Sequence, residues 1–224
     1  MCFLTEMHFH TAESSVCAQV PVSEALPFYK EYGYKTIVIT DHMARWYVEN
    51  RSTEHFLLGY RSALEAAEKY DINILLGMEL NIDSMPNDYL LYGMTEELVL
   101  SNPDLPSLTE SEVKEFADKN GLLVIQAHPF RSWCYPGEAK NLHGVEVYNG
   151  NTDWYSPEQS EKALRFAEEN NLIKTAGTDF HKFYHTPGTG LVFPEEIKDS
   201  GTLMPFLKDG NYDLAKSSTF DRKE

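Results

Sequence analysis

The stretch of sequence that decides the fold is CFLTEMHFH, residues 2–10, in which the apolar run Cys2–Met7 ends in two histidines, His8 and His10. Residues i and i+2 of a β-strand point to the same side, so the two imidazoles can bind one metal ion. Four further apolar runs end in the same kind of residue. They are Thr36–Thr40 before Asp41-His42, Ile72–Met78 before Glu79, Leu122–Ala127 before His128, and Leu172–Thr178 before Asp179-Phe180-His181.

These strand ends predict a shared site. In α/β proteins the carboxyl ends of parallel strands are where functional sites are built. Imidazoles and carboxylates gathered at one rim suit Zn²⁺, Mn²⁺ or Fe²⁺. If the histidines only filled the core, all five strand ends would carry such residues by coincidence. The pattern therefore predicts a metal cluster at the mouth of a barrel, and a hydrolase.

Composition limits the partners. A chain of 224 residues with 42% hydrophobic residues suits a single α/β domain over residues 1–224. The formal net charge of −16 should repel long polyanions, so we expect no long nucleic acid as a partner. A small phosphorylated substrate is still possible, because bound divalent cations make a site locally positive.

The cysteines and the apolar runs point to the cytoplasm. The number of cysteines, three, is odd, and the sequence has no CxxC motif, so a reducing compartment is the default. Cys134 lies near His128 and is either a ligand or, as we favour, a free small side chain. No run reaches the ~18 apolar residues that cross a membrane, and no signal peptide is visible. The sequence does not predict an oligomeric state.

Strand-like runs alternate with helix-like segments, which favours a mostly parallel sheet. We expect strands near 3–9, 36–41, 72–79, 89–94, 122–128, 144–149 and 172–179, and helices near 23–33, 54–70, 110–120 and 157–170. Thr109–Glu112 has the pattern of a capping box, and Gly121 is a helix stop signal. Seven strands with function at their carboxyl ends suggest a barrel, although an open sheet would give the same local pattern.

Cations and aromatic residues near the strand ends are candidates for substrate contact. Arg131, three residues after His128, has the planar fork that suits phosphate oxygens, and Arg45 and Lys182 are further candidates. A surface role is as plausible for each arginine. Trp46, Trp133 and Trp154 either stack on an organic group or, as is more common, pack under loops.

In their order along the chain, the motifs HxH, TDH, GMEL, AHP and GTDFH resemble those of the PHP (polymerase and histidinol phosphatase) family, over residues 1 to about 195. The resemblance implies a distorted (β/α)7 TIM-like barrel with a metal site at the carboxyl ends of the strands. It also implies two or three divalent metal ions (Mn, Zn or Fe) and hydrolysis of phosphate esters.

The resemblance also implies a set of ligands. His8, His10, Glu79 and Asp179 would bind a first ion, and Glu79 would bridge to a second ion that His128 also binds. The family often has a histidine before a short Leu-Leu-x-Tyr-Gly strand. The corresponding stretch here is Asp88-Tyr89-Leu90-Leu91-Tyr92-Gly93, so Asp88 stands at the position of that histidine. His42 and His181 would bind a third ion, with Glu13 as a partner, while Asp41 would orient a ligand. Glu146 lines the site, orients a ligand or only fills the barrel interior.

The expected reaction is hydrolysis of a phosphate ester of a small soluble substrate by a metal-activated water. Arg131 would hold the phosphate, and Asp41, Asp88 or His181 would pass a proton to the leaving alkoxide. One alternative is a metal-dependent amidase or lactonase on a similar barrel. Such sites often contain a carbamylated lysine, but no lysine occupies a strand-end motif position here. Another alternative is a metal-binding regulatory module without activity.

Overall fold

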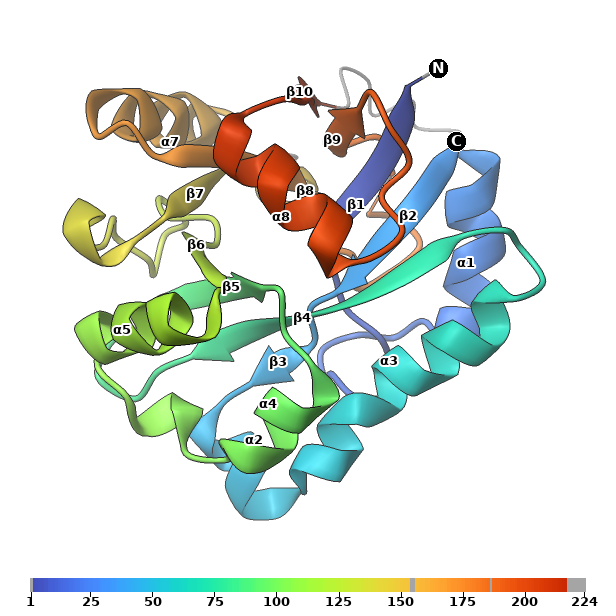
Figure 1. Ribbon diagram of the computed structural model, residues 1–224, viewed down its shortest axis with the longest axis horizontal. Helices are drawn as coiled ribbons and strands as arrows, with labels where there is room; N and C mark the ends of the chain where they lie inside the picture. The colour runs from blue at the N-terminus through green and yellow to red at the C-terminus, as the bar shows by residue number, and fades with distance from the viewer. Residues whose placement is uncertain (1, 154–155, 186, 217–224) are drawn as a thin grey trace.

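The computed structural model describes residues 2–153, 156–185 and 187–216. Its centre is a strongly curved sheet, in which the strands follow the order β10-β9-β1-β2-β4-β5-β6-β7-β8, and β3 pairs with β4. Figure 1 shows the strands gathered at the centre and the helices around them. The strands are β1 (Phe3–Phe9), β2 (Tyr34–Ile39), β3 (His42–Met43), β4 (Asn73–Asn81), β5 (Asp88–Tyr92), β6 (Leu123–Gln126), β7 (Gly144–Asn149), β8 (Ile173–Gly177), β9 (Gly190–Phe193) and β10 (Asp213–Ala215).

The sheet nearly closes into a barrel between β1 and the end of β8. Phe9 and Phe180 form an isolated parallel bridge. The amide of Asp179 donates to the carbonyl of His8 at 2.9 Å, and that of His10 donates to the carbonyl of Phe180 at 3.2 Å. The closure therefore lies at the HxH motif itself, and it brings the first and last strand-end motifs together.

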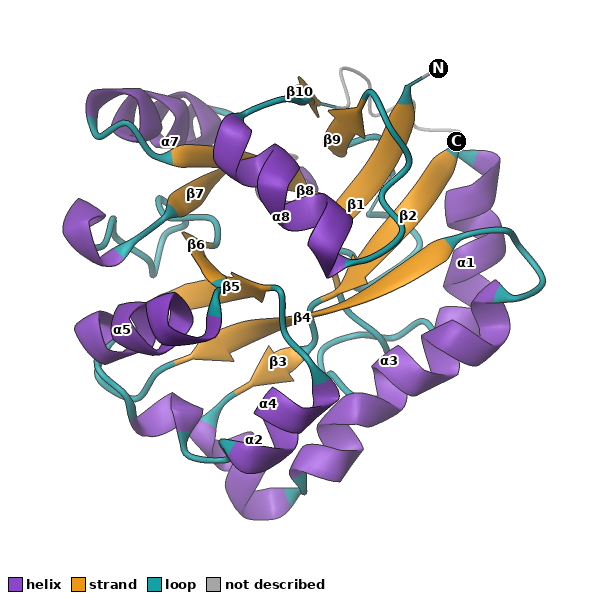
Figure 2. Cartoon of the chain, in the orientation of Figure 1, coloured by secondary structure: helices purple, strands orange, loops and turns teal. Residues whose placement is uncertain are grey.

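Most of the helices cover the outside of the barrel (Figure 2). They are α1 (Val22–Glu31), α2 (Arg45–Asn50), α3 (Thr53–Ala67), α4 (Glu96–Ser101), α5 (Glu110–Asn120), α6 (Gly150–Asp153), α7 (Glu158–Glu169) and α8 (Ser200–Asp209). One apolar cluster packs α1 and α3 on β1 and β2, and a second packs α3, α5 and α7 on β4 and β7. Burial of these apolar faces stabilises the arrangement, because the hydrophobic free energy is roughly proportional to the apolar area removed from water.

Helix α8 differs from the others because it packs on the interior of the barrel. Its Leu203, Met204 and Leu207 join a buried cluster with interior residues such as Leu75 and Ile125. Met204 also lies beside Gly93, after β5, and Leu122, before β6. Helix α8 therefore covers the end of the barrel opposite the carboxyl ends of the parallel strands.

The predicted barrel is confirmed, and each of the seven predicted strands is present within a few residues of its expected bounds. The predicted helices correspond to α1, α3, α5 and α7. The capping box at Thr109 and the left-handed Gly121 after α5 are also confirmed. The short strands β3, β9 and β10, and helices α2, α4, α6 and α8, were not predicted. Strand β5 is antiparallel to both neighbours, so the sheet is less uniformly parallel than the alternation suggested.

Candidate metal centre

Four of the predicted ligands meet at the closure of the barrel. Nε2 of His8 and Nε2 of His10 lie 3.1 Å apart. Glu79, on β4, places Oε1 3.3 Å from the first nitrogen and Oε2 3.1 Å from the second. Oδ1 of Asp179 lies 3.6 Å and 3.4 Å from the same two nitrogens. All four side chains are buried, so the structure brings these residues together as the sequence predicted.

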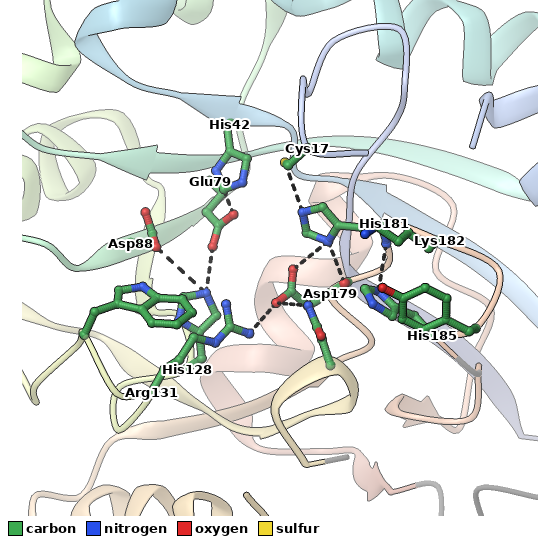
Figure 3. A pocket seen from close by; sticks show the side chains of 13 residues that line it. Cys17, His42, Glu79, Asp88, His128, Arg131, Asp179, His181, Lys182 and His185 are labelled. Carbon is green, nitrogen blue, oxygen red and sulfur yellow. Dashed lines mark hydrogen bonds and ion pairs between the residues drawn. The ribbon is translucent and has the colours of Figure 1, made fainter. Parts of the chain in front are cut away.

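The other predicted histidines surround this centre (Figure 3). Nδ1 of His42 is 3.0 Å from Oε2 of Glu79, on the opposite side from His128, whose Nε2 is 3.1 Å from Oε1. Asp88 reaches within 3.9 Å of the same nitrogen of His128. Nδ1 of His181 is 3.3 Å from Oδ1 of Asp179. Glu79 is thus in reach of ligands on both sides, as a bridging carboxylate must be.

Two of these residues have an unusual backbone. His128 has φ of 29° and Asp179 has φ of 54°. Non-glycine residues are uncommon at positive φ, and such strain persists where surrounding contacts hold it. The amide of His128 donates to Oε2 of Glu146 at 3.1 Å, and Asp179 has its hydrogen bond to the backbone of His8. At both positions the strained turn aims the side chain into the centre.

An outer layer of polar groups orients the ligands. Oε1 of Glu146 lies 2.9 Å from Nδ1 of His8, and Ser15 Oγ lies 3.2 Å from Nδ1 of His10. That serine donates to Asp41 at 2.6 Å, and Asp41 also accepts from the amide and hydroxyl of Thr11, both at 2.8 Å. Asp41 therefore lies behind the centre and does not line the pocket. This position agrees with a role of Asp41 in orienting the ligands. It does not fit the predicted proton transfer, because Asp41 does not face the pocket.

The centre concentrates opposite charges. Although burial opposes ionisation, the charge of His8 holds the pKa of Glu79 well below its usual value, and the charges of His8 and Arg131 do the same for Asp179. Burial works against the protonated form of His10, but its contacts with the Asp179 and Glu79 carboxylates raise its pKa to about 9. The two carboxylates are thus held as anions.

The outer histidines behave differently. Burial lowers the pKa of His42 to about 4 and that of His181 to about 3, and the charge of His10 lowers both further. Both imidazoles are therefore neutral at pH 7. A neutral imidazole is the form that ligates metal.

The donor set fits divalent ions. Oε2 of Glu79 and Oδ1 of Asp179 are buried oxygens with no hydrogen-bond partner among the described residues, although imidazole nitrogens face both. Two nitrogens that share a tetrahedral ion at ~2.1 Å lie roughly 3.4 Å apart, close to the 3.1 Å between His8 and His10. Ligand atoms also approach within 4.8 Å of one another in the groups His8-His10-Glu79, His8-His128-Asp179, His10-His42-His181, His42-Glu79-Asp88 and Asp88-His128-Cys134.

The centre opens into a pocket of about 470 Å³. Arg131 and Lys182 both line it, together with Trp133. The Arg131 guanidinium is almost buried, donates to Oδ2 of Asp179 at 2.5 Å, and lies over the Trp133 ring. Arg131 therefore joins the ligand shell to the pocket wall, a contact that its sequence position alone did not reveal.

Several predicted residues lie elsewhere. Arg45 is half exposed and pairs with Asp83, so it does not line the pocket. Glu13 accepts from the amide of Val22 at 3.1 Å, which turns its carboxylate toward the start of α1 and away from the histidines. Trp46 is exposed beside Tyr47 and does not line the pocket either. Trp154 lies outside the described residues.

One side chain that the sequence reasoning missed also lines the pocket. Sγ of Cys17 lies 3.1 Å from Nε2 of His181 and lines the pocket. It lies in the irregular segment between β1 and α1, so only the path of the loop shows it. Cys134, which was weighed as a ligand, lies 3.8 Å from Nδ1 of His128.

A comparison with protein families agrees with this geometry. The PHP domain profile matches residues 6–191, which is most of the chain. The chain belongs to the PHP domain family. The match includes every strand-end motif that supplies the centre, from His8 to His181. None of the described helices has the length and apolar character needed to cross a bilayer.

Solved structures share the fold at low sequence identity. A two-domain protein of Bacteroides vulgatus that contains a predicted PHP-like metal-dependent phosphoesterase has a TM-score of 0.68 and 18% identity, over 96% of this chain and 64% of that one. An amidohydrolase of Chromobacterium violaceum has a TM-score of 0.60 and 13% identity, over 94% of this chain and 97% of that one. The lesion-specific endonuclease EndoQ of Pyrococcus furiosus has a TM-score of 0.59 and 13% identity, over 96% of this chain and 58% of that one.

A curated relative matches a shorter stretch. The PolC-type DNA polymerase III of Lacticaseibacillus paracasei is 34% identical over 86 residues, which is 38% of this chain. The matched stretch is only 5% of the polymerase. The family match therefore shows that the chain is a PHP domain, and the solved structures show the fold that it shares with them.

Proposed function

We propose that this protein hydrolyses a phosphate ester of a small soluble substrate. The observation that carries the proposal is the convergence of buried imidazoles and carboxylates, 3.0–3.6 Å apart, at the base of a pocket whose wall includes Arg131 and Lys182. Bound divalent ions would lower the pKa of water to near neutrality and offset charge on the phosphoryl oxygens. His8, His10, Glu79 and Asp179 would hold the first ion.

The chain's own residues would divide the remaining work. Glu146 and Ser15 fix the ring orientations of His8 and His10. Arg131 keeps Asp179 in place and presents positive charge to the pocket. Asp88 and His181 line the pocket and remain the candidates for moving a proton to the leaving group, since Asp41 lies behind the ligands.

The size and charge of the site favour a small substrate. A pocket of about 470 Å³ can enclose a sugar-phosphate or a similar organic phosphate. The net charge of −16 should weaken association with DNA or RNA, most strongly at low salt. We therefore expect small phosphoesters to turn over faster than single-stranded or duplex DNA, with a contrast that decreases as salt rises.

The amidase or lactonase alternative has less support. Among the described residues, Lys182 is the lysine that lines the pocket, and it lies on the loop after β8 with its ammonium group over the Tyr184 ring. The similarity to an amidohydrolase concerns the fold alone.

The test is a substrate panel with the metal-loaded protein. Protein loaded with Mn²⁺, Zn²⁺ or Fe²⁺ is assayed against phosphomonoesters, phosphodiesters, DNA, amides and lactones. His8→Ala and Asp179→Ala should lose metal and turnover together, whereas His143→Ala, whose imidazole pairs with Asp118 at the surface, should keep both. Turnover of amides or lactones but not phosphoesters would favour the alternative. Metal binding without any turnover would favour an inactive regulatory module.

A further inference from the structure

Trp133 presents an exposed indole to the pocket. Its position in the sequence left open whether the ring stacks on an organic group or packs under a loop. In the structure Trp133 is 55% exposed and lines the pocket, so the ring does not pack under a loop. Single exposed apolar residues are common on protein surfaces, and exposure by itself therefore assigns no role. The role of the indole follows from its neighbours.

The indole lies close to the ligand shell of the metal centre. The guanidinium of Arg131 lies 5.4 Å from the centroid of the Trp133 ring and donates to Oδ2 of Asp179 (Figure 3). Asp179 is a candidate ligand of the first ion, so a single guanidinium separates the indole from the ligands. A phosphoryl group held by the ions would therefore place the first atoms of its alcohol within reach of Trp133.

The second aromatic side chain of the pocket lies on the far side of the centre. Among the described residues that line the pocket, Trp133 and Tyr184 are the aromatic ones apart from the histidines. Tyr184 lies on the loop after β8, where its ring packs edge-on against His185 with 4.7 Å between the centroids. Figure 3 shows His185 and Arg131 on opposite sides of Asp179. Trp133 is therefore the aromatic side chain on the Arg131 side.

Two buried amide side chains hold the loop that carries Trp133. Oδ1 of Asn87 accepts from the backbone amide of Tyr135 at 3.2 Å, and Nε2 of Gln126, at the end of β6, donates to the carbonyl of Tyr135 at 2.8 Å. Both amide side chains belong to fully buried residues. A surface that is fixed before binding loses less conformational entropy when a ligand covers it. The backbone beside the indole is therefore preorganised for binding.

We propose that Trp133 is the platform for a planar aromatic ring in the alcohol part of the substrate, next to the ester oxygen. The inference rests on the proposed function, because it takes the phosphoryl group to lie at the metal centre. An offset aromatic pair is stabilised beyond the burial of its apolar area, and a saturated ring of the same size lacks this contribution. The pocket should therefore select aryl or arylmethyl phosphoesters over their saturated counterparts.

The experiment measures binding with phosphonates that cannot be hydrolysed. The Mn²⁺-loaded full chain is titrated calorimetrically with methylphosphonate, cyclohexylmethylphosphonate and benzylphosphonate. Methylphosphonate has no ring and reports on the metal centre alone. We expect wild type to bind benzylphosphonate about 3–10-fold more tightly than cyclohexylmethylphosphonate. The kcat/KM values of benzyl phosphate and cyclohexylmethyl phosphate should show the same ratio, since both leaving groups are primary alcohols.

Variants assign the preference to one ring. Trp133→Leu should bring the ratio close to one, whereas Trp133→Phe should keep most of it, because a phenyl ring can still stack. Tyr135 is the matched control, since it is a 50% exposed aromatic residue of the same loop that does not line the pocket. Tyr135→Leu should keep the wild-type ratio. Trp133 is more than half exposed, so its variants should fold, which circular dichroism checks.

The outcomes separate this inference from the proposed function. Equal affinity of wild type for the two ring-bearing phosphonates would overturn the inference, and so would a preference that survives Trp133→Leu or that is lost only in Tyr184→Leu. Hydrolysis of both esters with equal kcat/KM would keep the proposed function and refute the platform. A preference that depends on Trp133, without hydrolysis of either ester, would keep the platform and refute phosphoester hydrolysis.

Discussion

Nδ1 of His8 lies 2.9 Å from Oε1 of Glu146, with both side chains fully buried. The carboxylate holds a hydrogen of the imidazole on Nδ1, so Nε2 is the nitrogen that faces Glu79 and Asp179. The second oxygen of Glu146 accepts from the backbone amide of His128 and from Asn149. One carboxylate thus positions two candidate ligands that lie far apart in the sequence.

Glu146→Ala should therefore weaken metal binding without removing a ligand. Loss of such an orienting partner typically reduces affinity or activity by ~10–100-fold. Glu146→Gln should fall between, because its amide oxygen can serve His8 while its amide hydrogens oppose those of Asn149. Isothermal titration with Zn²⁺ and Mn²⁺ measures both variants. Wild-type affinity in Glu146→Ala would show that β7 serves only the barrel core.

Metal loading should release protons. In the ion-free protein, burial alone would disfavour protonated His8, but the charges of Glu146, Glu79 and Asp179 raise its pKa well above the usual value, and that of His10 is raised to about 9. Both groups therefore carry protons at pH 7, and ligation must displace them. Metal affinity should rise with pH between pH 6 and about pH 9. Titration in buffers of different ionisation enthalpy should give a release of about one proton or more per molecule, and no release would contradict these assignments.

The strand ends could be predicted because parallel strands repeat one physical pattern. An apolar run followed by His, Asp or Glu marks the point where the chain leaves the core, and the barrel then brings these points together at one rim. Glu79 and Asp179 lie far apart in the sequence, yet both were placed by this rule.

The rest depends on contacts without periodicity. Glu13 and Cys17 belong to one irregular loop. This loop is tied to α3 through Ser14, which accepts from the amide of Gly59 at 2.8 Å, a contact between segments far apart in the sequence. Arg131 was predicted only as a phosphate contact. Its pair with Asp179 joins segments that lie far apart in the sequence, so no local pattern indicates it. The burial of α8 against the barrel interior likewise depends on the closed sheet.

Arg131→Ala should lower kcat/KM and the free energy of unfolding of the ion-free protein. The sequence predicted Arg131 as a phosphate contact, and the 2.5 Å pair with Asp179 gives it a structural role as well. Breaking a buried pair by removing one partner costs about 3–5 kcal/mol, since it leaves an uncompensated charge. Arg131→Lys should recover part of the loss, because a point charge cannot reproduce the planar fork.

Arg45→Ala is the matched control. The Arg45 side chain is 53% exposed and pairs with Asp83, and such surface pairs contribute ~0–1 kcal/mol. It should leave metal content, turnover and the free energy of unfolding nearly unchanged. Elemental analysis and urea unfolding of both variants make the comparison. Equal effects at the two positions would remove Arg131 from the ligand shell.

Gly59→Ala should destabilise the protein although it lies within helix α3 (Thr53–Ala67). Alanine in a helix interior is normally favoured over glycine by roughly 0.5–1 kcal/mol. Here an added Cβ would collide with the hydroxyl of Thr11 and the carboxylate of Asp41, which together hold the loop behind His10. Overpacking of this kind costs about 1–3 kcal/mol and should outweigh the helix preference.

Gly201→Ala in α8, where the nearest atom to the new Cβ is Asp199 Oδ1 at 3.3 Å, should be neutral or slightly stabilising. Urea unfolding gives the two signs, and metal titration should show weaker binding in Gly59→Ala alone. A stabilised Gly59→Ala with normal metal affinity would show that the loop yields without moving the ligands.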